Sequence, residues 1–377
     1  MIMKNRKKML FLWAVLCAVH AIAQTADLAK LDKNFRTATF KNYKVEYRNA
    51  LVSPFVLEGF PWWKPGDVLY RLPKDHFTKQ NVKPAVLNLA NQVSGGAVLF
   101  RTNSKYITIR AKLRWASNSD RMPRAGSGGF DFYLRGVKQE KYLNTLRPTH
   151  AAIVKEEPME MLLNRNDGKM HDYILYLPLY SGVERLEIGT EPGAKFETPT
   201  PHRVKKPVLF YGSSIIQGSA ASRPANNFST MLARTLDFHQ INLGFSGNGL
   251  CYPKMAELIG TLDLAAIITN IENNGSLTYL KQNYPAFLRT IRRKLPKVPI
   301  IVISFSPVTY PQKARYMEEL VKQMAAAGDK NIYYVDCGKH FDYAFGTVDN
   351  CHPNDHGFYR SYEVILPVLH KILTAKH

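Results

Sequence analysis

The period of the hydrophobic pattern changes near residue 200, and this change restricts the possible fold more than any other feature of the chain. From about Phe35 to Glu191 apolar and polar residues alternate, most strictly over Ile107–Arg114. Alternation with period two is typical of half-buried antiparallel strands. Further short runs of this kind are Gly129–Leu134, Tyr173–Leu179 and Arg185–Ile188. Regularly spaced strands without long helical patterns between them predict a β-sandwich or jelly roll.

Strand and helix patterns alternate after the proline-rich segment Pro199–Pro207. The helical patterns include an apolar stripe over Ala314–Met324 and another over Tyr362–Leu373. The expected strands are Val208–Tyr211, Ile241–Leu243, Ala265–Thr269, Ile300–Phe305 and Ile332–Val335. Apolar strands alternating with helices predict a parallel sheet covered on both faces. We therefore predict an all-β sandwich domain over residues 24–200, followed by a three-layer, flavodoxin-like α/β domain with five parallel strands over residues 201–377.

The N-terminus has the pattern of a signal peptide. Basic residues from Lys4 to Lys8 precede the apolar run Met9–Val19, and small residues follow at Ala21 and Ala23. The apolar run is shorter than the ~20 residues that a membrane-spanning helix needs. We expect residues 1–23 to be removed and the protein to be exported, to the periplasm or beyond.

The formal net charge of +21 is high. Solvated, scattered Lys and Arg are the simplest interpretation, and an acidic polysaccharide partner is an alternative. Export and the absence of a nucleic-acid motif argue against nucleic acid as a partner. The cysteines beyond the leader are Cys251, Cys337 and Cys351, an odd number without metal-ligand spacing. Either a Cys337–Cys351 disulfide or reduced thiols would fit.

Polar and glycine-rich segments occur where strands of the second half end. They are Gly212–Ser214 with Gly218 after it, Gly244–Gly249, Asn270–Asn274, and Asp349–His352 before the last helix. Ligands of open parallel sheets bind at these carboxyl ends. Each segment alone also fits a structural role, as a helix cap, a glycine turn, an asparagine turn or a plain loop.

In order and spacing the four segments resemble the conserved blocks of the SGNH/GDSL hydrolases, over roughly Val208–Thr374. The resemblance implies that Ser214 is the nucleophile, His352 the general base and Asp349 its acidic partner. An alcohol needs such a base because it is a poor nucleophile at its own pKa. The resemblance implies neither a metal nor an organic cofactor.

The same resemblance implies an oxyanion hole formed by the backbone N–H groups of Ser214 and Gly247 and by the side chain of Asn274. Two positions depart from the family pattern. Ser213 stands where the usual block has Asp, and the third block lacks Gly-x-Asn-Asp. Asn270 and Asn273 are therefore alternatives to Asn274 as the amide donor.

The first half resembles the β-sandwich that precedes this domain in a bacterial subgroup of the family. The residues that carry this likeness are Arg71–Pro73 and Gly126–Leu134. We expect the segment Arg124–Gly129 to form a flexible loop beside the active site.

These features together predict a carboxylic ester hydrolase. We expect a serine esterase that removes short acyl groups, above all acetyl, from carbohydrate, with an acylated glycan or another small ester as substrate. A hydrolase of lipid or other short-chain esters is the second enzyme hypothesis, and a catalytically inactive glycan-binding protein is the third. The sequence leaves the oligomeric state open.

Overall fold

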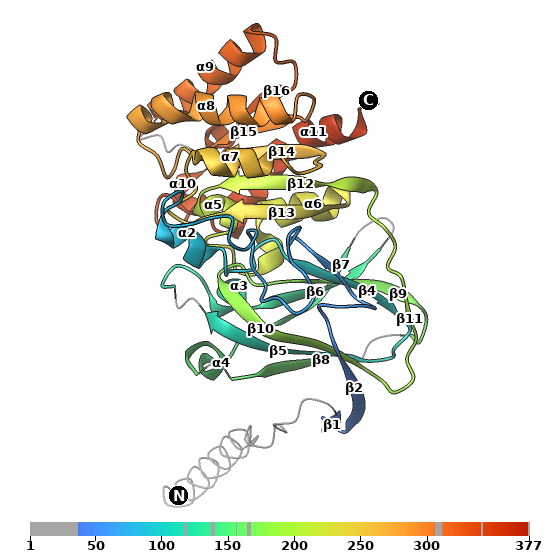
Figure 1. Ribbon diagram of the computed structural model, residues 1–377. Helices are drawn as coiled ribbons and strands as arrows, with labels where there is room; N and C mark the ends of the chain where they lie inside the picture. Colours follow the sequence, from blue (N-terminus) through green and yellow to red (C-terminus); the bar gives the residue numbers. More distant parts are fainter. Residues whose placement is uncertain are drawn as a thin grey trace, which may run out of the picture.

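The computed structural model (Figure 1) describes residues 37–116, 119–136, 140–155, 157–163, 167–305, 311–340 and 342–375. The predicted signal peptide, residues 1–23, lies outside these ranges. Within them, no helix combines the length and the apolar character that crossing a membrane requires.

Two antiparallel sheets form the first domain, called the β domain below. One sheet has the order β1 (Thr37–Phe40), β2 (Tyr43–Asn49), β10 (Ser181–Thr190), β5 (Ile107–Ala116) and β8 (Met159–Leu163). The other has the order β11 (Phe196–Glu197), β4 (Ala97–Thr102), β9 (His171–Tyr176), β6 (Phe130–Arg135) and β7 (Lys141–Leu146), and β3 (Val56–Glu58) pairs with β4. Its short helices are α2 (Pro84–Leu89), α3 (Arg124–Ser127) and α4 (His150–Val154).

The strand with the strictest alternation, β5, belongs to the first sheet and packs its apolar face against the second. In β5 the residues Ile107, Ile109, Ala111 and Leu113 are buried and share one apolar cluster with Phe100 and Leu175 of the other sheet. This shared core confirms the predicted β-sandwich.

The second domain, called the α/β domain below, contains a parallel sheet with the order β13 (Phe238–Gly244), β12 (Val204–Gly212), β14 (Ala266–Asn270), β15 (Ile300–Ser304) and β16 (Ile332–Asp336). Each pair of adjacent strands in this sheet runs parallel. The first strand lies between the second and the third, which is the flavodoxin-like order. This confirms the predicted five-stranded architecture.

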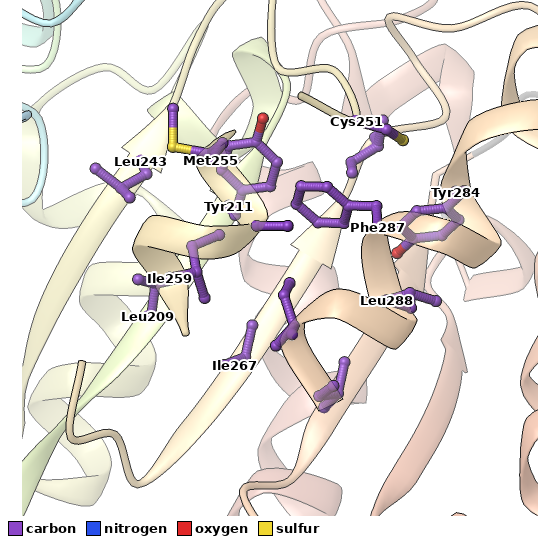
Figure 2. Packing of buried hydrophobic residues seen from close by; sticks show 14 of the residues in the cluster. Leu209, Tyr211, Leu243, Cys251, Met255, Ile259, Ile267, Tyr284, Phe287 and Leu288 are labelled. Carbon is purple, nitrogen blue, oxygen red and sulfur yellow. The ribbon is translucent and has the colours of Figure 1, made fainter. Parts of the chain in front are cut away.

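Helices cover both faces of this sheet. α7 (Pro253–Ile259), α8 (Leu277–Lys294) and α9 (Pro311–Ala326) pack on one face. Figure 2 shows Phe287 of α8 and Met255 of α7 against Tyr211 and Leu243 of the strands. The other face carries α5 (Ser214–Gln217), α6 (Phe228–Leu236) and α11 (Asp355–Thr374). Short turns, η2 (Pro224–Asn226), η3 (Gly338–His340) and α10 (Tyr343–Gly346), complete the layer.

The β domain packs directly against the carboxyl ends of the parallel strands. Val86 of α2 belongs to the same apolar cluster as Leu243 and Phe245 at the end of β13. A second contact involves Gly126 of α3, where an added Cβ would lie 2.1 Å from the Ala221 carbonyl oxygen. The expectation of a flexible loop at Arg124–Gly129 is therefore wrong, because this segment is a packed helical turn.

Candidate active site

The turn that follows β12 exposes a serine hydroxyl at the start of α5. Gly212 has φ of 151°, and a Cβ there would lie 1.9 Å from the Asn270 carbonyl oxygen, so the turn needs glycine. Ser213 caps α5 by accepting the Ile215 N–H, and its hydroxyl donates to Asn270 Oδ1 at 2.6 Å. The first residue of the helix is thus Ser214.

The loop before α11 brings the predicted base and acid to this serine. Ser214 Oγ lies 2.9 Å from His352 Nε2, and His352 Nδ1 lies 2.7 Å from Asp349 Oδ2. A ring that donates from Nδ1 to the carboxylate leaves Nε2 free to accept the serine proton. The structure therefore brings together the three residues that the sequence predicted as a triad.

Hydrogen bonds hold the Asp349 carboxylate in place. Its Oδ1 accepts the backbone N–H groups of His352 at 2.8 Å and Cys351 at 3.2 Å. Its Oδ2 accepts Arg121 Nη1 at 3.0 Å, in addition to the His352 ring. Partial burial by itself would raise the pKa of Asp349, but the His352 backbone N–H, the Arg121 guanidinium and the His352 ring lower this pKa to about 2. The acid is therefore ionised wherever the imidazole can act as a base.

Two backbone donors near the nucleophile have no acceptor. Within the described part of the chain, neither the Ser214 N–H nor the Gly247 N–H makes a hydrogen bond. Gly247 has φ of 69°, and its Cβ position faces open space. The Phe245 N–H donates to the Gly212 carbonyl at 2.8 Å, which ties the Gly247 loop to the nucleophile turn. Unpaired N–H groups of this kind can bind an oxyanion.

The three candidate asparagines have different surroundings. The Asn274 amide lies against the Gly247 loop, where its oxygen can accept the N–H groups of Gly249 at 2.8 Å and Asn248 at 3.1 Å. Asn270 is buried and already bonded to Ser213 and, through Nδ2, to the Ile303 carbonyl at 3.3 Å. Asn273 has a buried Oδ1 without a partner in the described structure. Because both ends of the Asn270 amide are bonded inside the fold, Asn270 is the least available of the three as an oxyanion-hole donor.

Arg71 of the β domain supports the Gly247 loop, and no pattern in the sequence indicated this role. The guanidinium of Arg71 is fully buried and donates to the Asn242 carbonyl at 2.9 Å and the Gly244 carbonyl at 2.8 Å. It also lies over the Phe245 ring, 4.8 Å from its centroid. Burial lowers the pKa of Arg71 to about 9. The sequence marked Arg71 only as part of a family likeness, without a role.

Gln217 joins three parts of the site. Its Oε1 accepts the Ser246 N–H at 3.0 Å, and its Nε2 donates to Gln92 Oε1 and to the Leu179 carbonyl of the β domain. The nucleophile helix, the Gly247 loop and the β domain therefore form one hydrogen-bonded unit.

A groove of about 580 Å³ runs between the domains beside these residues. Its walls are about equally polar and apolar, and both domains contribute to them. The lining residues are Ala85, Asn88, Leu89, Gln92, Ser119, Asp120, Arg121, Tyr180, Ser219, Ser246 and Asn248. Arg121 carries no motif in the sequence, so no pattern pointed to its position beside the triad.

Metal-ligand clusters and a disulfide are the other features that the sequence raised. In the part of the chain that the structure describes, no three His, Cys, Asp or Glu side chains are grouped as a metal would require. Cys251, Cys337 and Cys351 are free thiols, so the structure holds no Cys337–Cys351 disulfide.

Comparisons with known proteins agree with this architecture. The model of the GDSL-like Lipase/Acylhydrolase family matches residues 205–370, and the model of the N-terminus of Esterase_SGNH_hydro-type matches residues 45–196. A comparison with curated proteins found no match.

Solved structures match over most of the chain. A protein from Bacteroides ovatus, described as a GDSL-like lipase, is 28% identical with a TM-score of 0.76, over 88% of this chain and 99% of that one. Salicylyl-acyltransferase SsfX3 from a tetracycline biosynthetic pathway is 19% identical, with a TM-score of 0.70 over 85% and 95%. An acetyl xylan esterase from Butyrivibrio proteoclasticus is 13% identical, with a TM-score of 0.56 over 87% and 98%, and shares the fold. With both family models matched in consecutive halves, the chain belongs to the SGNH (GDSL-like) hydrolase family and carries the N-terminal domain of its SGNH esterases.

Proposed function

We propose that this protein is an exported serine esterase that removes short acyl groups, above all acetyl, from carbohydrate. The observation that carries the proposal is the relay of hydrogen bonds from Ser214 through His352 to Asp349, with distances of 2.9 and 2.7 Å. A nucleophile, a base and an orienting acid in mutual contact are what acyl transfer to serine requires.

In the proposed mechanism, Ser214 Oγ attacks the ester carbonyl carbon while its proton passes to His352 Nε2. The resulting imidazolium is stabilised by Asp349. It then gives the proton to the leaving alkoxide, which departs as the alcohol and leaves an acyl-enzyme. Water, deprotonated by the same imidazole, attacks the acyl-enzyme and releases the acid and Ser214.

Each attack on the carbonyl carbon, first by Ser214 and later by water, forms a tetrahedral intermediate. Its former carbonyl oxygen carries a negative charge near the nucleophile turn. The unpaired N–H groups of Ser214 and Gly247 are available to it, and we assign Asn274 as the third donor. Each donor of this type typically lowers the barrier by ~3–4 kcal/mol.

The interdomain groove favours a hydroxyl-rich alcohol over a lipid. About half of its wall surface is polar, and the side chains of Asn88, Gln92, Ser119 and Asn248 are among the groups that line it. Such groups can exchange hydrogen bonds with sugar hydroxyls, whereas an acyl chain would leave them unpaired. Export, which rests on the signal-peptide pattern, would bring the enzyme to external glycans.

The first test is covalent labelling with a fluorophosphonate, which reacts only with an activated serine. The wild type should be labelled, Ser214→Ala should be neither labelled nor active, and Ser213→Ala should keep its label. An unlabelled, folded wild type would instead support the hypothesis of an inactive glycan-binding protein. Labelled Ser214→Ala together with unlabelled Ser213→Ala would move the nucleophile by one residue.

A second measurement separates the two esterase hypotheses. Aryl esters from acetyl to octanoyl are compared with acetylated xylan and with an emulsified lipid ester. We expect kcat/KM to be highest for acetyl and activity on the polysaccharide to exceed that on lipid. A preference for octanoyl and for the emulsion would favour the lipid hypothesis.

A further inference from the structure

One arginine of the β domain reaches the acid and base of the candidate triad. Arg121 follows β5 in the chain, and its Nη1 lies 3.0 Å from Asp349 Oδ2 and 3.3 Å from His352 Nδ1. The same carboxylate oxygen accepts the ring N–H at 2.7 Å. Arg121 and the imidazole therefore share one acceptor.

With Arg121, the carboxylate of Asp349 accepts four N–H groups. The Cys351 and His352 backbone N–H groups occupy Oδ1, and Arg121 and the ring occupy Oδ2. A carboxylate has about four such positions, so none is left over and the group cannot rotate without losing a bond. Holding it in this way also holds the imidazole that it orients.

Arg121 acts on the ring through the carboxylate. Its Nη1 also lies 3.3 Å from His352 Nδ1, but both atoms are donors when the ring donates to Asp349, so this contact is not a hydrogen bond. The Arg121 side chain is 46% exposed, so solvent screens its charge, and its bond to Asp349 is the contact that matters for the ring.

We propose that Arg121 is a positioning residue of the triad, supplied by the β domain, that fixes Asp349 and through it the orientation of the His352 ring. This inference rests on the proposed esterase function. It also gives the β domain a role in catalysis that does not depend on the size of the substrate.

The test compares Arg121→Gln, Arg121→Lys and the matched control Arg124→Gln on a small neutral ester. Arg124 is an exposed arginine three residues further along the same segment. For p-nitrophenyl acetate, Arg121→Gln should lower kcat by about 10-fold with little change in KM, since a carboxylate that can rotate holds the imidazole less well. Arg121→Lys should recover part of the loss, and Arg124→Gln should match the wild type.

The alternatives give different results. A higher KM with an unchanged kcat would make Arg121 a substrate-binding residue, and lower stability with an unchanged kcat would make it a docking contact. Either result would overturn the inference. The NMR signal of the His352 Nδ1 proton, which should broaden in Arg121→Gln and stay sharp in Arg124→Gln, gives the same answer without turnover. A missing esterase activity would therefore refute the proposed function while leaving the inference open to its own test.

Discussion

A charged cluster at the junction of the two domains predicts how stability depends on pH. His202, in the segment between the domains, has Nε2 3.0 Å from Glu58 Oε2 and Nδ1 2.7 Å from Asp237 Oδ1. Arg135 Nη2 donates to the same Asp237 oxygen at 2.7 Å. Because both ring nitrogens face carboxylates, the ring satisfies both as a donor only when it is protonated.

The geometry determines the sign of the effect. Burial by itself would lower the pKa of His202, but the bonds to Asp237 and Glu58 outweigh it and raise the pKa from 6.5 to about 9. The folded state therefore holds this proton more tightly than the unfolded chain does. Its contribution to stability is complete below about pH 6.5 and is lost as the pH rises through about 9. A shift of this size corresponds to ~3 kcal/mol in the free energy of unfolding.

The perturbation is His202→Gln, and the assay is urea unfolding from pH 6 to pH 10. We expect the free energy of unfolding of the wild type to exceed that of the variant most at pH 6. This difference should shrink by ~3 kcal/mol by pH 10. His171→Gln is the control, because His171 pairs with Asp167 at the surface, where such pairs contribute ~0–1 kcal/mol. If the free energies of unfolding of wild type and His202→Gln changed in parallel with pH, the reasoning would be refuted, since the folded state would then not hold the His202 proton more tightly.

Two more variants test the loop that carries Gly247. Asn274→Ala should lower kcat by ~10²–10³ with little change in KM, because its donor acts on charge that develops in the transition state. Steady-state kinetics checks this, and an equal loss in Asn273→Ala but not in Asn274→Ala would contradict the assignment. Arg71→Met should lower the free energy of unfolding by ~3–5 kcal/mol, because it leaves the buried carbonyl groups of Asn242 and Gly244 without this donor. A urea-unfolding difference below ~1 kcal/mol would show that these bonds contribute little.

Local patterns were enough to predict both architectures. The alternation over Ile107–Arg114 places every second side chain on one face of β5, and such a strand is stable only when that face is buried. In the second half, the short apolar strands and amphipathic helices recur with the spacing that a parallel sheet requires. Their periods are properties of neighbouring residues, so the chain alone reveals them.

The core of the candidate site was also accessible from sequence. The carboxyl ends of parallel strands lie at one edge of the sheet, so Ser214, Gly247 and Asn274 had to come near one another once the strand order was right. Asp349 and His352 are three residues apart, and their mutual contact is local. Their catalytic roles stay predictions until the variants are measured.

Contacts between the domains were decided only by the tertiary structure. Arg121 lies 228 residues before Asp349 in the chain, and Arg71 lies 171 residues before Asn242, in segments without a charge pattern. Arg124–Gly129 was expected to be flexible because its glycines suggested a loop. Gly126 instead permits close contact between its own backbone and that of Ala221 in the other domain. Such contacts depend on how the surfaces of the two domains pack together. The pattern of residues along either segment does not indicate this packing. For this reason the sequence identified a serine, a histidine and an acid, while only the folded chain placed an arginine beside them.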